Sequence, residues 1–288
     1  MFQFLRTYTQ LALQNWTLLI RSIVSVLGLI FLFLESFEVL SNKDVELPYV
    51  YFLISTLSLS FIIFLIDGFL ISGFLKRKIV IEIHGIETKI NIKFGDIFSE
   101  HGWRAIAVGD FLDHEVDENL VSSSSLHGQA LCKYWKGNID DWRRQIDSSM
   151  GKRQHSEESR NGVGQTRRYE IGAVASAISG KEKFLFLVLG ITNTTNNVTT
   201  SNLANLVKGI QHLLVEARKK CSGEPLVVPM LGTGLARVGL KSSATIDLII
   251  SLVMEESRQG KITDEISIII PNSKSDKINL KNHETNWK

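Results

Sequence analysis

Two long apolar stretches near the start of the chain constrain its fold more than any other feature. They run from Trp16 to Leu34 and from Tyr49 to Ile66, with a short polar segment between them. Each is close to the ~20 residues that a helix needs to cross a ~30 Å hydrocarbon core. We therefore predict a transmembrane hairpin in residues 1–78, with spans at about 16–34 and 49–75.

The basic residues around the hairpin predict which side of the membrane holds its two ends. Lys and Arg near membrane spans are retained in the cytoplasm, whereas acidic residues have little effect. The segment between the spans has one basic residue, Lys43, and the outer flanks have five: Arg6, Arg21, Lys76, Arg77 and Lys78. The N-terminus and the part that follows the hairpin are thus predicted to be cytoplasmic. A cleaved secretory signal is the alternative, but the apolar run is too long and no small-residue cleavage site follows it.

Two charged residues, Arg21 and Asp67, fall within the apolar stretches. A cross-helix pair, within one hairpin or between hairpins, would satisfy both charges. Arg21 lies close to the interface, so snorkelling of its side chain toward water is the alternative for that residue.

Residues 79–288 are long enough for one soluble domain of ordinary size. Cys132 and Cys221 are too few for a disulfide framework. The net charge of +2, without a basic stripe, argues against nucleic acid as a partner. The seven histidines lack metal-ligand spacing, so we predict no metal site.

Apolar runs in this part alternate between strand and helix patterns. The predicted strands are 79–84, 89–94, 105–108, 184–189, 226–228 and 266–270. The predicted helices are 126–135, one beginning at Ser201, and one capped by Ser242 or Ser243. This order predicts an α/β fold, a mixed and largely parallel sheet with helices on both faces. Residues 143–168 lose periodicity and fill with charge, Ser and Gly, which predicts a flexible insert.

A glycine-rich loop follows the strand at 226–228, at an edge where sheets of this class bind ligands. Gly232 and Gly234 permit positive φ and leave backbone amides uncovered, so that successive N–H groups can surround a phosphate. A plain tight turn uses the same residues. No glycine of this loop is followed directly by a Lys-Ser/Thr pair, which excludes a P-loop ATPase.

Two motifs in this order resemble the macro domain family: Gly95-Asp96-Ile97 after an early strand, and Pro229 to Ala236 as a late loop. The resemblance implies a macro-domain fold in which Asp96 and Ile97 hold adenine. It also implies that a late loop holds the diphosphate of ADP-ribose, through Leu231, Gly232, Thr233, Gly234, Leu235, Ala236 and Arg237. An ordinary turn aspartate is the alternative for Asp96.

The segment from Phe111 to Gly128, with its Leu-Asp and Ser-Leu-His-Gly, is similar to the macro domain of Thoeris antiphage effectors, which couple two membrane helices to a macro domain. The resemblance implies a homo-oligomeric effector of the bacterial inner membrane that disrupts the membrane in abortive infection. Its ligand would be an ADP-ribose derivative, such as histidine-ADP-ribose made from NAD by a TIR-domain partner. Further ligand contacts would come from Gly109, Asp110, Ser125, Leu126, His127 and Gly128.

Departures from the family pattern bear on activity. ADP-ribosyl-hydrolysing macro domains carry an Asn-rich segment and a glycine-rich catalytic loop, and residues 108–113 and 122–128 differ from both. Gly109 also stands where a polar Asn is expected. A Ser-His nucleophile at 122–127 lacks orienting partners. We therefore predict a binding protein with no catalytic residues and no cofactor; a membrane-tethered ADP-ribosyl hydrolase and a passive ADP-ribose reader are the alternatives.

Overall fold

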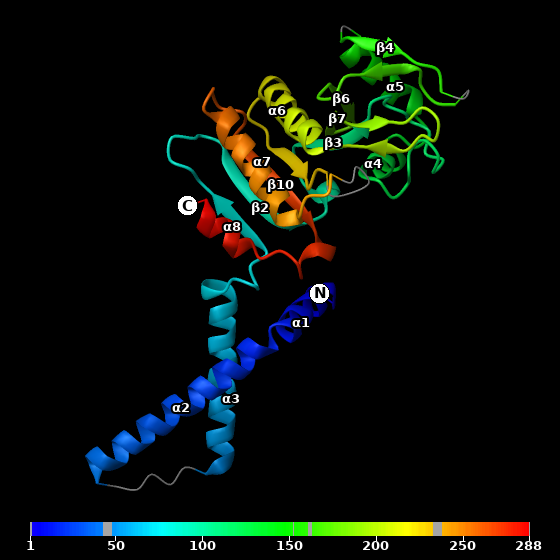
Figure 1. The fold of residues 1–288 in the computed structure, drawn as a ribbon. Helices are drawn as coiled ribbons and strands as arrows, with labels where there is room; N and C mark the ends of the chain where they lie inside the picture. The colour runs from blue at the N-terminus through cyan, green and yellow to red at the C-terminus, as the bar shows by residue number, and fades with distance from the viewer. Residues whose placement is uncertain (1, 43–47, 152, 161–162, 233–237, 288) are drawn as a thin grey trace. The chain divides into compact units, whose positions relative to one another are not determined.

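The computed structural model describes residues 2–42, 48–151, 153–160, 163–232 and 238–287. Contacts within the chain divide it into two compact units. The first comprises Met1–Arg77 and Asn279–Thr285, and the second comprises Lys78–Ile278 and Asn286–Lys288. Figure 1 traces the elements of both units.

The first unit consists of helices. Its elements are α1 (Phe2–Gln14), α2 (Trp16–Ser41), α3 (Tyr49–Ile66), a π-helical turn (Asp67–Ile71) and most of α8 (Leu280–Asn286). Helix α2 and the stretch from Tyr49 to Ile71 are long and apolar enough to cross a membrane, by length and composition. They are therefore candidates for the predicted membrane hairpin. Helix α1 was not predicted from the sequence.

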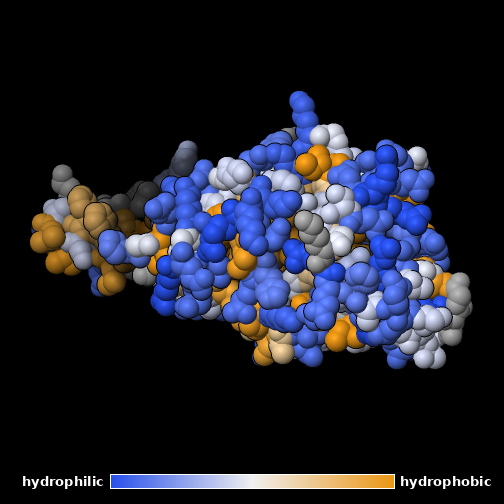
Figure 2. Space-filling model, turned by 90° about the horizontal axis from the view of Figure 1, so that it is seen from above, coloured by the Kyte–Doolittle hydropathy of each residue, from blue (hydrophilic) through white to orange (hydrophobic). Residues whose placement is uncertain are grey.

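Hydrophobic side chains cover the surface of α2 and α3. The exposed ones include Leu32, Phe33, Tyr51 and Leu53, each more than half exposed. In the space-filling view, the visible part of the N-terminal helices is largely hydrophobic, whereas the visible face of the second unit is largely hydrophilic (Figure 2). Water would not favour so much exposed apolar surface, so these helices need a lipid or protein environment.

The two charged residues of the apolar stretches do not pair with each other within the described part of this chain. Asp67 instead accepts a hydrogen bond from Ser72, with Oγ 2.6 Å from Oδ2. The Asp67 carboxylate thus has a hydrogen-bond partner at the other end of its own π-helical turn. The predicted Arg21–Asp67 pair is thus not formed inside the hairpin.

The second unit is built on an eight-stranded sheet. Seven strands follow the order β1-β2-β10-β9-β3-β7-β6, and β8 pairs with β7. Strands β2, β10, β9, β3 and β7 run parallel, whereas β1, β6 and β8 are antiparallel to their neighbours. The strand bounds are β1 Lys78–Ile81, β2 Lys89–Gly95, β3 Trp103–Gly109, β6 Val174–Ser179, β7 Glu182–Thr192, β8 Thr199–Thr200, β9 Leu226–Pro229 and β10 Glu265–Pro271.

Helices cover both faces of this sheet, as the continuous apolar strands predict. Along β7, Phe184 and Phe186 belong to a core cluster with residues of α4 (Leu126–Tyr134) and α5 (Ile139–Met150). The alternate residues Leu187 and Leu189 face Gly209 of α6 (Leu203–Lys220). Helix α6 lies beside α7 (Ser242–Ser257) (Figure 1). The predicted mixed, largely parallel sheet with two covered faces is confirmed.

The prediction that residues 143–168 lack regular structure is wrong. Helix α5 occupies the first part, because Trp142, Ile146 and Met150 recur every four residues and are all buried. A two-stranded antiparallel hairpin follows, made of β4 (His155–Glu157) and β5 (Arg167–Tyr169). We call residues 155–169 the arm.

Two predicted helix starts also need correction. Helix α6 is capped by Asn202, whose side chain accepts from the Asn205 amide, whereas Ser201 donates to the Leu189 carbonyl. Helix α7 begins at Ser242 itself, and its N-cap position is Lys241.

Candidate functional site

The carboxyl ends of the parallel strands define one edge of the sheet. Asp96 follows β2, Asp110 follows β3, and Met230 to Gly232 follow β9. Strands β3 and β9 pair only at Trp103 with Leu226 and Arg104 with Val227, so beyond these residues their ladder ends. In open α/β sheets, ligands bind beyond the carboxyl ends of the strands. This edge is therefore the candidate site.

Asp96 begins a short 3₁₀ helix, Ile97–Ser99, at the end of β2. Its Oδ1 accepts the Phe98 amide at 3.0 Å, while Ile97 and Phe98 turn into the core. The side chain is exposed, and Oδ2 has no partner among the described residues. One oxygen of Asp96 thus fixes the turn, and the other is available to a ligand.

Arg104 holds this loop from inside. The residue is 2% exposed, and its Nε donates to the Ile97 carbonyl at 3.0 Å. The same guanidinium donates to the Glu100 carbonyl and pairs with Glu182. Buried charges are expensive unless they are paired and hydrogen-bonded. Arg104 therefore restrains the loop that presents Asp96, a role that its position in an apolar strand did not indicate.

Asp110 is buried at the end of β3 and bonds to residues of two other strands, β5 and β7. Its Oδ2 lies 2.7 Å from Nε of Arg168, and its Oδ1 accepts the Thr192 amide at 3.0 Å. The backbone carbonyl of Asp110 accepts the Tyr169 amide at 2.8 Å. Burial lowers the pKa of Arg168, but hydrogen bonds and charges from Asp110 and Glu158 outweigh this effect and raise the pKa overall. The carboxylate of Asp110 therefore positions the arm and the end of β7.

Gly109 has little room for any other residue. A Cβ there would lie 3.0 Å from Oγ1 of Thr192 and 3.3 Å from Oγ1 of Thr199. These two hydroxyls are themselves 2.8 Å apart. The threonine pair accounts for a glycine at the position where the family resemblance implies Asn.

A second arginine of the arm reinforces the first. Arg160 is 2% exposed, and its Nη1 contacts both oxygens of Asp113, at 2.9 and 2.7 Å. Its Nη2 donates to Oδ1 of Asn197 at 3.0 Å. The guanidinium carbons of Arg160 and Arg168 lie 4.2 and 5.4 Å from the centre of the Phe111 ring. The sequence signal was weak, because the partners are 47 and 58 positions apart.

The ligand contacts that the resemblance implies at Ser125–Gly128 lie at the start of α4. Ser125 caps the helix: its Oγ accepts a hydrogen bond from the Gly128 amide at 2.9 Å and donates one to the Ser122 carbonyl at 2.7 Å. Leu126 opens the helix and is partly buried against the core. A Cβ on Gly128 would lie 2.3 Å from the Ser122 carbonyl oxygen, so this residue must be small.

His127 is a core residue. It is 6% exposed and its ring centre lies 5.8 Å from the rings of both Trp142 and Phe186. Burial, with a smaller contribution from His114, lowers the pKa of His127 to about 3. A neutral imidazole among aromatic rings has no orienting carboxylate for nucleophile activation. The structure places His127 in the first turn of α4, with its ring packed against Trp142 of α5 and Phe186 of β7.

The late loop begins in the core of the second unit. Met230 and Leu231 are buried, and Gly232 adopts a left-handed φ of 76°. The Val238 amide donates to the Gly232 carbonyl at 3.1 Å, which closes the loop at its base. The predicted phosphate contacts Thr233, Gly234, Leu235, Ala236 and Arg237 lie outside the described residues.

A cavity of about 380 Å³ lies between the arm and the ends of β3 and β7. Its lining has three carboxylates, one arginine and several neutral polar groups. The residues are Asp110, Gln154, His155, Ser156, Glu158, Arg168, Tyr169, Glu170, Ile171 and Ile191. This volume is within the range of small-molecule sites. Asp110 belongs both to the lining of this cavity and to the candidate edge, where it follows β3.

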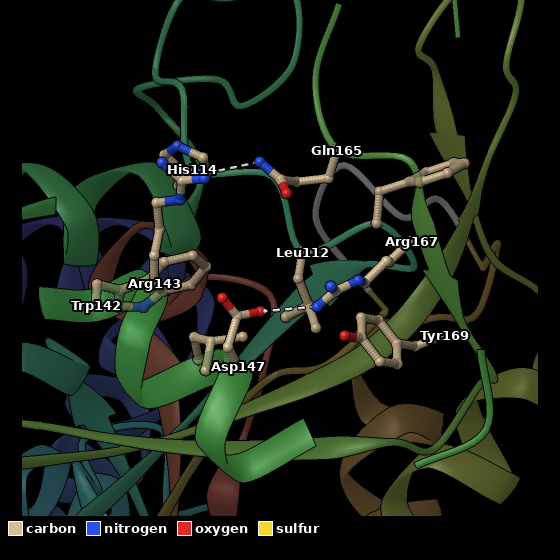
Figure 3. A pocket seen from close by; sticks show the side chains of 10 residues that line it. Leu112, His114, Trp142, Arg143, Asp147, Gln165, Arg167 and Tyr169 are labelled. Carbon is tan, nitrogen blue, oxygen red and sulfur yellow. Dashed lines mark hydrogen bonds and ion pairs between the residues drawn. The ribbon is translucent and has the colours of Figure 1, made fainter. Parts of the chain in front are cut away.

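A smaller cavity of about 30 Å³ is lined by residues of α5 and of the arm (Figure 3). Gln165 reaches His114, with Nε2 3.4 Å from Nδ1, and Arg167 reaches Asp147 at 3.4 Å. Burial, followed by the charge of Arg143, lowers the pKa of His114. The space suits about one water molecule, so it is not a nucleotide site.

Comparison with known proteins gives consistent matches. The family described as "Thoeris protein ThsA, Macro domain" matches residues 90–271, more than half of the chain. The curated "Thoeris protein ThsA" of Bacillus amyloliquefaciens (strain Y2) is 25% identical over 165 residues. That match covers 56% of this chain and 53% of the relative, so it spans about half of the relative's length.

Solved structures share the fold. The Oceanobacillus iheyensis macrodomain with ADP gives a TM-score of 0.51 at 12% identity, over 73% of this chain and 96% of that chain. A glycine-to-valine mutant of the same macrodomain, with ADPR, gives a TM-score of 0.51 at 12% identity, over 73% of this chain and 98% of that chain. At this identity the likeness establishes a macro-domain fold.

Proposed function

The chain belongs to the family of Thoeris ThsA macro domains, and from this premise we propose that residues 79–288 sense an ADP-ribose-derived nucleotide and control the helices of residues 1–78. The observation that carries the proposal is the position of Asp96. One oxygen of its carboxylate builds the turn, and the other is exposed at the end of a parallel strand. A carboxylate held in this way can accept a hydrogen bond from the amino group of adenine.

The diphosphate is proposed to bind at the late loop. Gly232 already has the left-handed backbone that lets successive amides point in one direction. Amides arranged in such a nest attract an anion without a cationic side chain. The loop follows β9, whose ladder with β3 is short, so the nucleotide would lie where these strands part.

The part of the ligand beyond the second phosphate is proposed to enter the cavity of about 380 Å³. Glu158 and Glu170 can accept hydrogen bonds there from sugar hydroxyls or from an amino group. Tyr169 and His155, with ring centres 5.7 Å apart, supply a surface for a flat group. These features suit an ADP-ribose that carries an amino acid, such as histidine-ADP-ribose.

We propose binding without turnover. Three observations support it: Ser125 is used as a helix cap, His127 is in the core, and Gly109 leaves no side chain at the end of β3. An ADP-ribosyl hydrolase would need a positioned base or nucleophile at this edge. A passive reader of ADP-ribosylated proteins would bind the same ligand without affecting a membrane.

In the full proposal, a TIR-domain enzyme consumes NAD and makes the signal, and this protein responds at the bacterial inner membrane. The macro domain and the N-terminus face the cytoplasm, and several copies assemble or rearrange so that the membrane is disrupted in abortive infection. Two candidate membrane helices support the membrane location. To shift the inactive and active states from 1:99 to 99:1, the ligand must favour the active state by about 5.5 kcal/mol.

The test uses the full chain in liposomes. Asp96→Asn keeps an oxygen for the Phe98 amide but replaces the exposed oxygen with an N–H donor. We expect its affinity for ADP-ribose, or for the histidine derivative, to fall about 10- to 100-fold, since a hydrogen bond to a charged group contributes about 1.5–3 kcal/mol. Isothermal calorimetry measures the affinity, and trapped dye reports leakage.

Asp117→Asn is the matched control, because Asp117 is also an exposed aspartate whose Oδ1 accepts backbone amides, those of Asn119 and Leu120. Its binding and leakage should equal those of the unmodified chain. Undiminished ligand-dependent leakage by Asp96→Asn would contradict the proposal. Binding without leakage would favour the passive reader, and release of ADP-ribose from a modified protein would favour the hydrolase.

A further inference from the structure

The chain passes between the two compact units three times. It leaves the first unit after Arg77, returns to it at Asn279, and leaves it again after Thr285. Most of helix α8 therefore belongs to the unit of the apolar helices, although the segments on both sides of it belong to the sheet unit. A peptide linker at residues 77–78 would be enough for simple attachment, so the second and third passages need another explanation.

Within the first unit, α8 contacts the segment that follows the second apolar helix. Nδ2 of Asn279 donates to the Ser72 carbonyl at 2.7 Å. Nζ of Lys76 lies 2.6 Å from Oε2 of Glu284, in a pair that is largely buried. A Cβ on Gly73, which has φ of 69°, would lie 2.3 Å from Cβ of Lys281. The helix is thus in close contact with residues 72–76.

The segment that α8 contacts adjoins a local change in helix geometry. Residues Asp67–Ile71 form the π-helical turn, and Ser72 closes it through its bond to Asp67. Single π-helical turns occur often at functional sites, and they are among the places where helices kink sharply. The contacts from Asn279 and Glu284 therefore act where the second apolar helix can change direction.

Within the second unit, both flanks of α8 are tied to α7. Before α8, Nζ of Lys274 lies 3.2 Å from Oγ of Ser242. After α8, Nε1 of Trp287 donates to Oδ1 of Asp247 at 2.8 Å. Ser242 is the first residue of α7, and the late loop that begins at Gly232 leads directly into it. A displacement of the loop would reach Ser242 and Asp247 through a rigid helix.

We propose that α8 transmits the state of the late loop to the end of the second apolar helix. This inference rests on the proposed function for the identity of the signal. The route runs from the loop to α7, from α7 to the flanks of α8, and from α8 to residues 72–76. Two features favour transmission over a purely structural role for α8. The segments on both sides of α8 bond to α7, the helix that follows the late loop. Helix α8 and Asn279 contact residues 72–76, which follow the π-helical turn.

The ligand-dependent test separates binding from response in full-length protein in liposomes. Glu284→Gln keeps the shape of the side chain but removes the charge that pairs with Lys76. We expect the affinity for ADP-ribose or its histidine derivative to stay within twofold, while ligand-induced dye leakage falls at least tenfold. Glu255→Gln, on the exposed Glu255–Arg258 pair of α7, is the control and should change neither. Normal leakage by Glu284→Gln would overturn the inference.

A second measurement needs no ligand. Trp287→Phe keeps an aromatic ring but removes the indole N–H that bonds to Asp247, in the second unit. We expect amide hydrogen exchange of residues 72–76, in the first unit, to accelerate at least tenfold, as α8 loosens. Unchanged exchange at 72–76 would overturn the inference even if the protein bound no ADP-ribose compound. An unmodified chain that binds none would instead contradict the proposed function, so the two failures are distinguishable.

Discussion

Nε of Arg168 lies 2.7 Å from Oδ2 of Asp110, and this pair joins the arm to the end of β3 across 58 positions of sequence. The carboxylate is almost fully buried, and Arg168 is partly exposed. Removal of one partner from a buried pair leaves an uncompensated charge, which is more costly than the pair itself is stabilising.

Arg168→Met should therefore lower the free energy of unfolding by about 3 kcal/mol. Urea unfolding of the full chain in detergent micelles, followed by tryptophan fluorescence, measures this loss. Arg167→Met is the control, because the neighbouring Arg167 is about half exposed, and it should change stability by less than about 1 kcal/mol. Adding Asp110→Asn to Arg168→Met should restore part of the loss; a purely additive double variant would show that the pair does not act as a unit.

Arg104→Met should weaken ligand binding from a distance. The change leaves the Ile97 and Glu100 carbonyls without their buried donor, so the loop of Asp96 loses its restraint. We expect about a tenfold loss of affinity for ADP-ribose in calorimetry, together with a lower melting temperature. Arg258→Met, on an exposed pair of α7, is the control and should alter neither. A destabilised protein with full affinity would mean that Arg104 does not position Asp96.

Gly128→Ala should disrupt the start of α4. The new Cβ would overlap the Ser122 carbonyl oxygen at 2.3 Å, and backbone atoms cannot rotate away as a flexible side chain can. A loss of about 2–3 kcal/mol in the free energy of unfolding is expected, as for overpacked cores. Gly28→Ala tests the same substitution within helix α2, where no atom lies within 4 Å of the added Cβ, and it should be tolerated. Equal stability of both variants would contradict the packing argument.

His127 should make the protein less stable in acid. Its pKa in the folded chain is about 3, below the ordinary value of 6.5, so the unfolded chain binds more protons between these values. The stability is fully present above pH 6.5 and is lost as the pH falls toward 3, by up to about 1.4 kcal/mol per pH unit. His127→Phe removes this titration and should flatten the pH dependence between pH 6.5 and 4.5 in urea unfolding. An unchanged slope would mean that His127 is not buried in its neutral form.

Much of the sheet was predictable, because its strands are continuous apolar runs separated by turn residues. The Gly-Asp-Ile motif and the helix that begins at Leu126 were likewise predictable, since both depend on residues close in sequence. Helix α5 was missed because the unpatterned window began at Arg143, one residue after Trp142, the first buried residue of its stripe. Strand β6 was missed because its inward residues, Ala175 and Ala177, are small and carry little hydrophobic signal.

The interior of the site could not be predicted for a different reason. Arg160 and Arg168 lie in a charged stretch that resembles a solvated loop, and only the folded chain brings Asp113 and Asp110 to them. The glycine at position 109 is explained by Thr192 and Thr199, which are far away in sequence. Pairings of this kind depend on which strands become neighbours, and no local pattern records that.

The two-residue ladder between β3 and β9 has a mechanical consequence. Every other parallel junction in the described sheet has a longer ladder, so the β3–β9 junction has the least backbone pairing among them to resist a pulling force. A ligand bound between Gly109 and Leu231 would contact both halves of the sheet. When the sheet is pulled apart in an optical trap, it should first break at the β3–β9 junction. A bound ligand should raise the rupture force, because it links the two halves of the sheet.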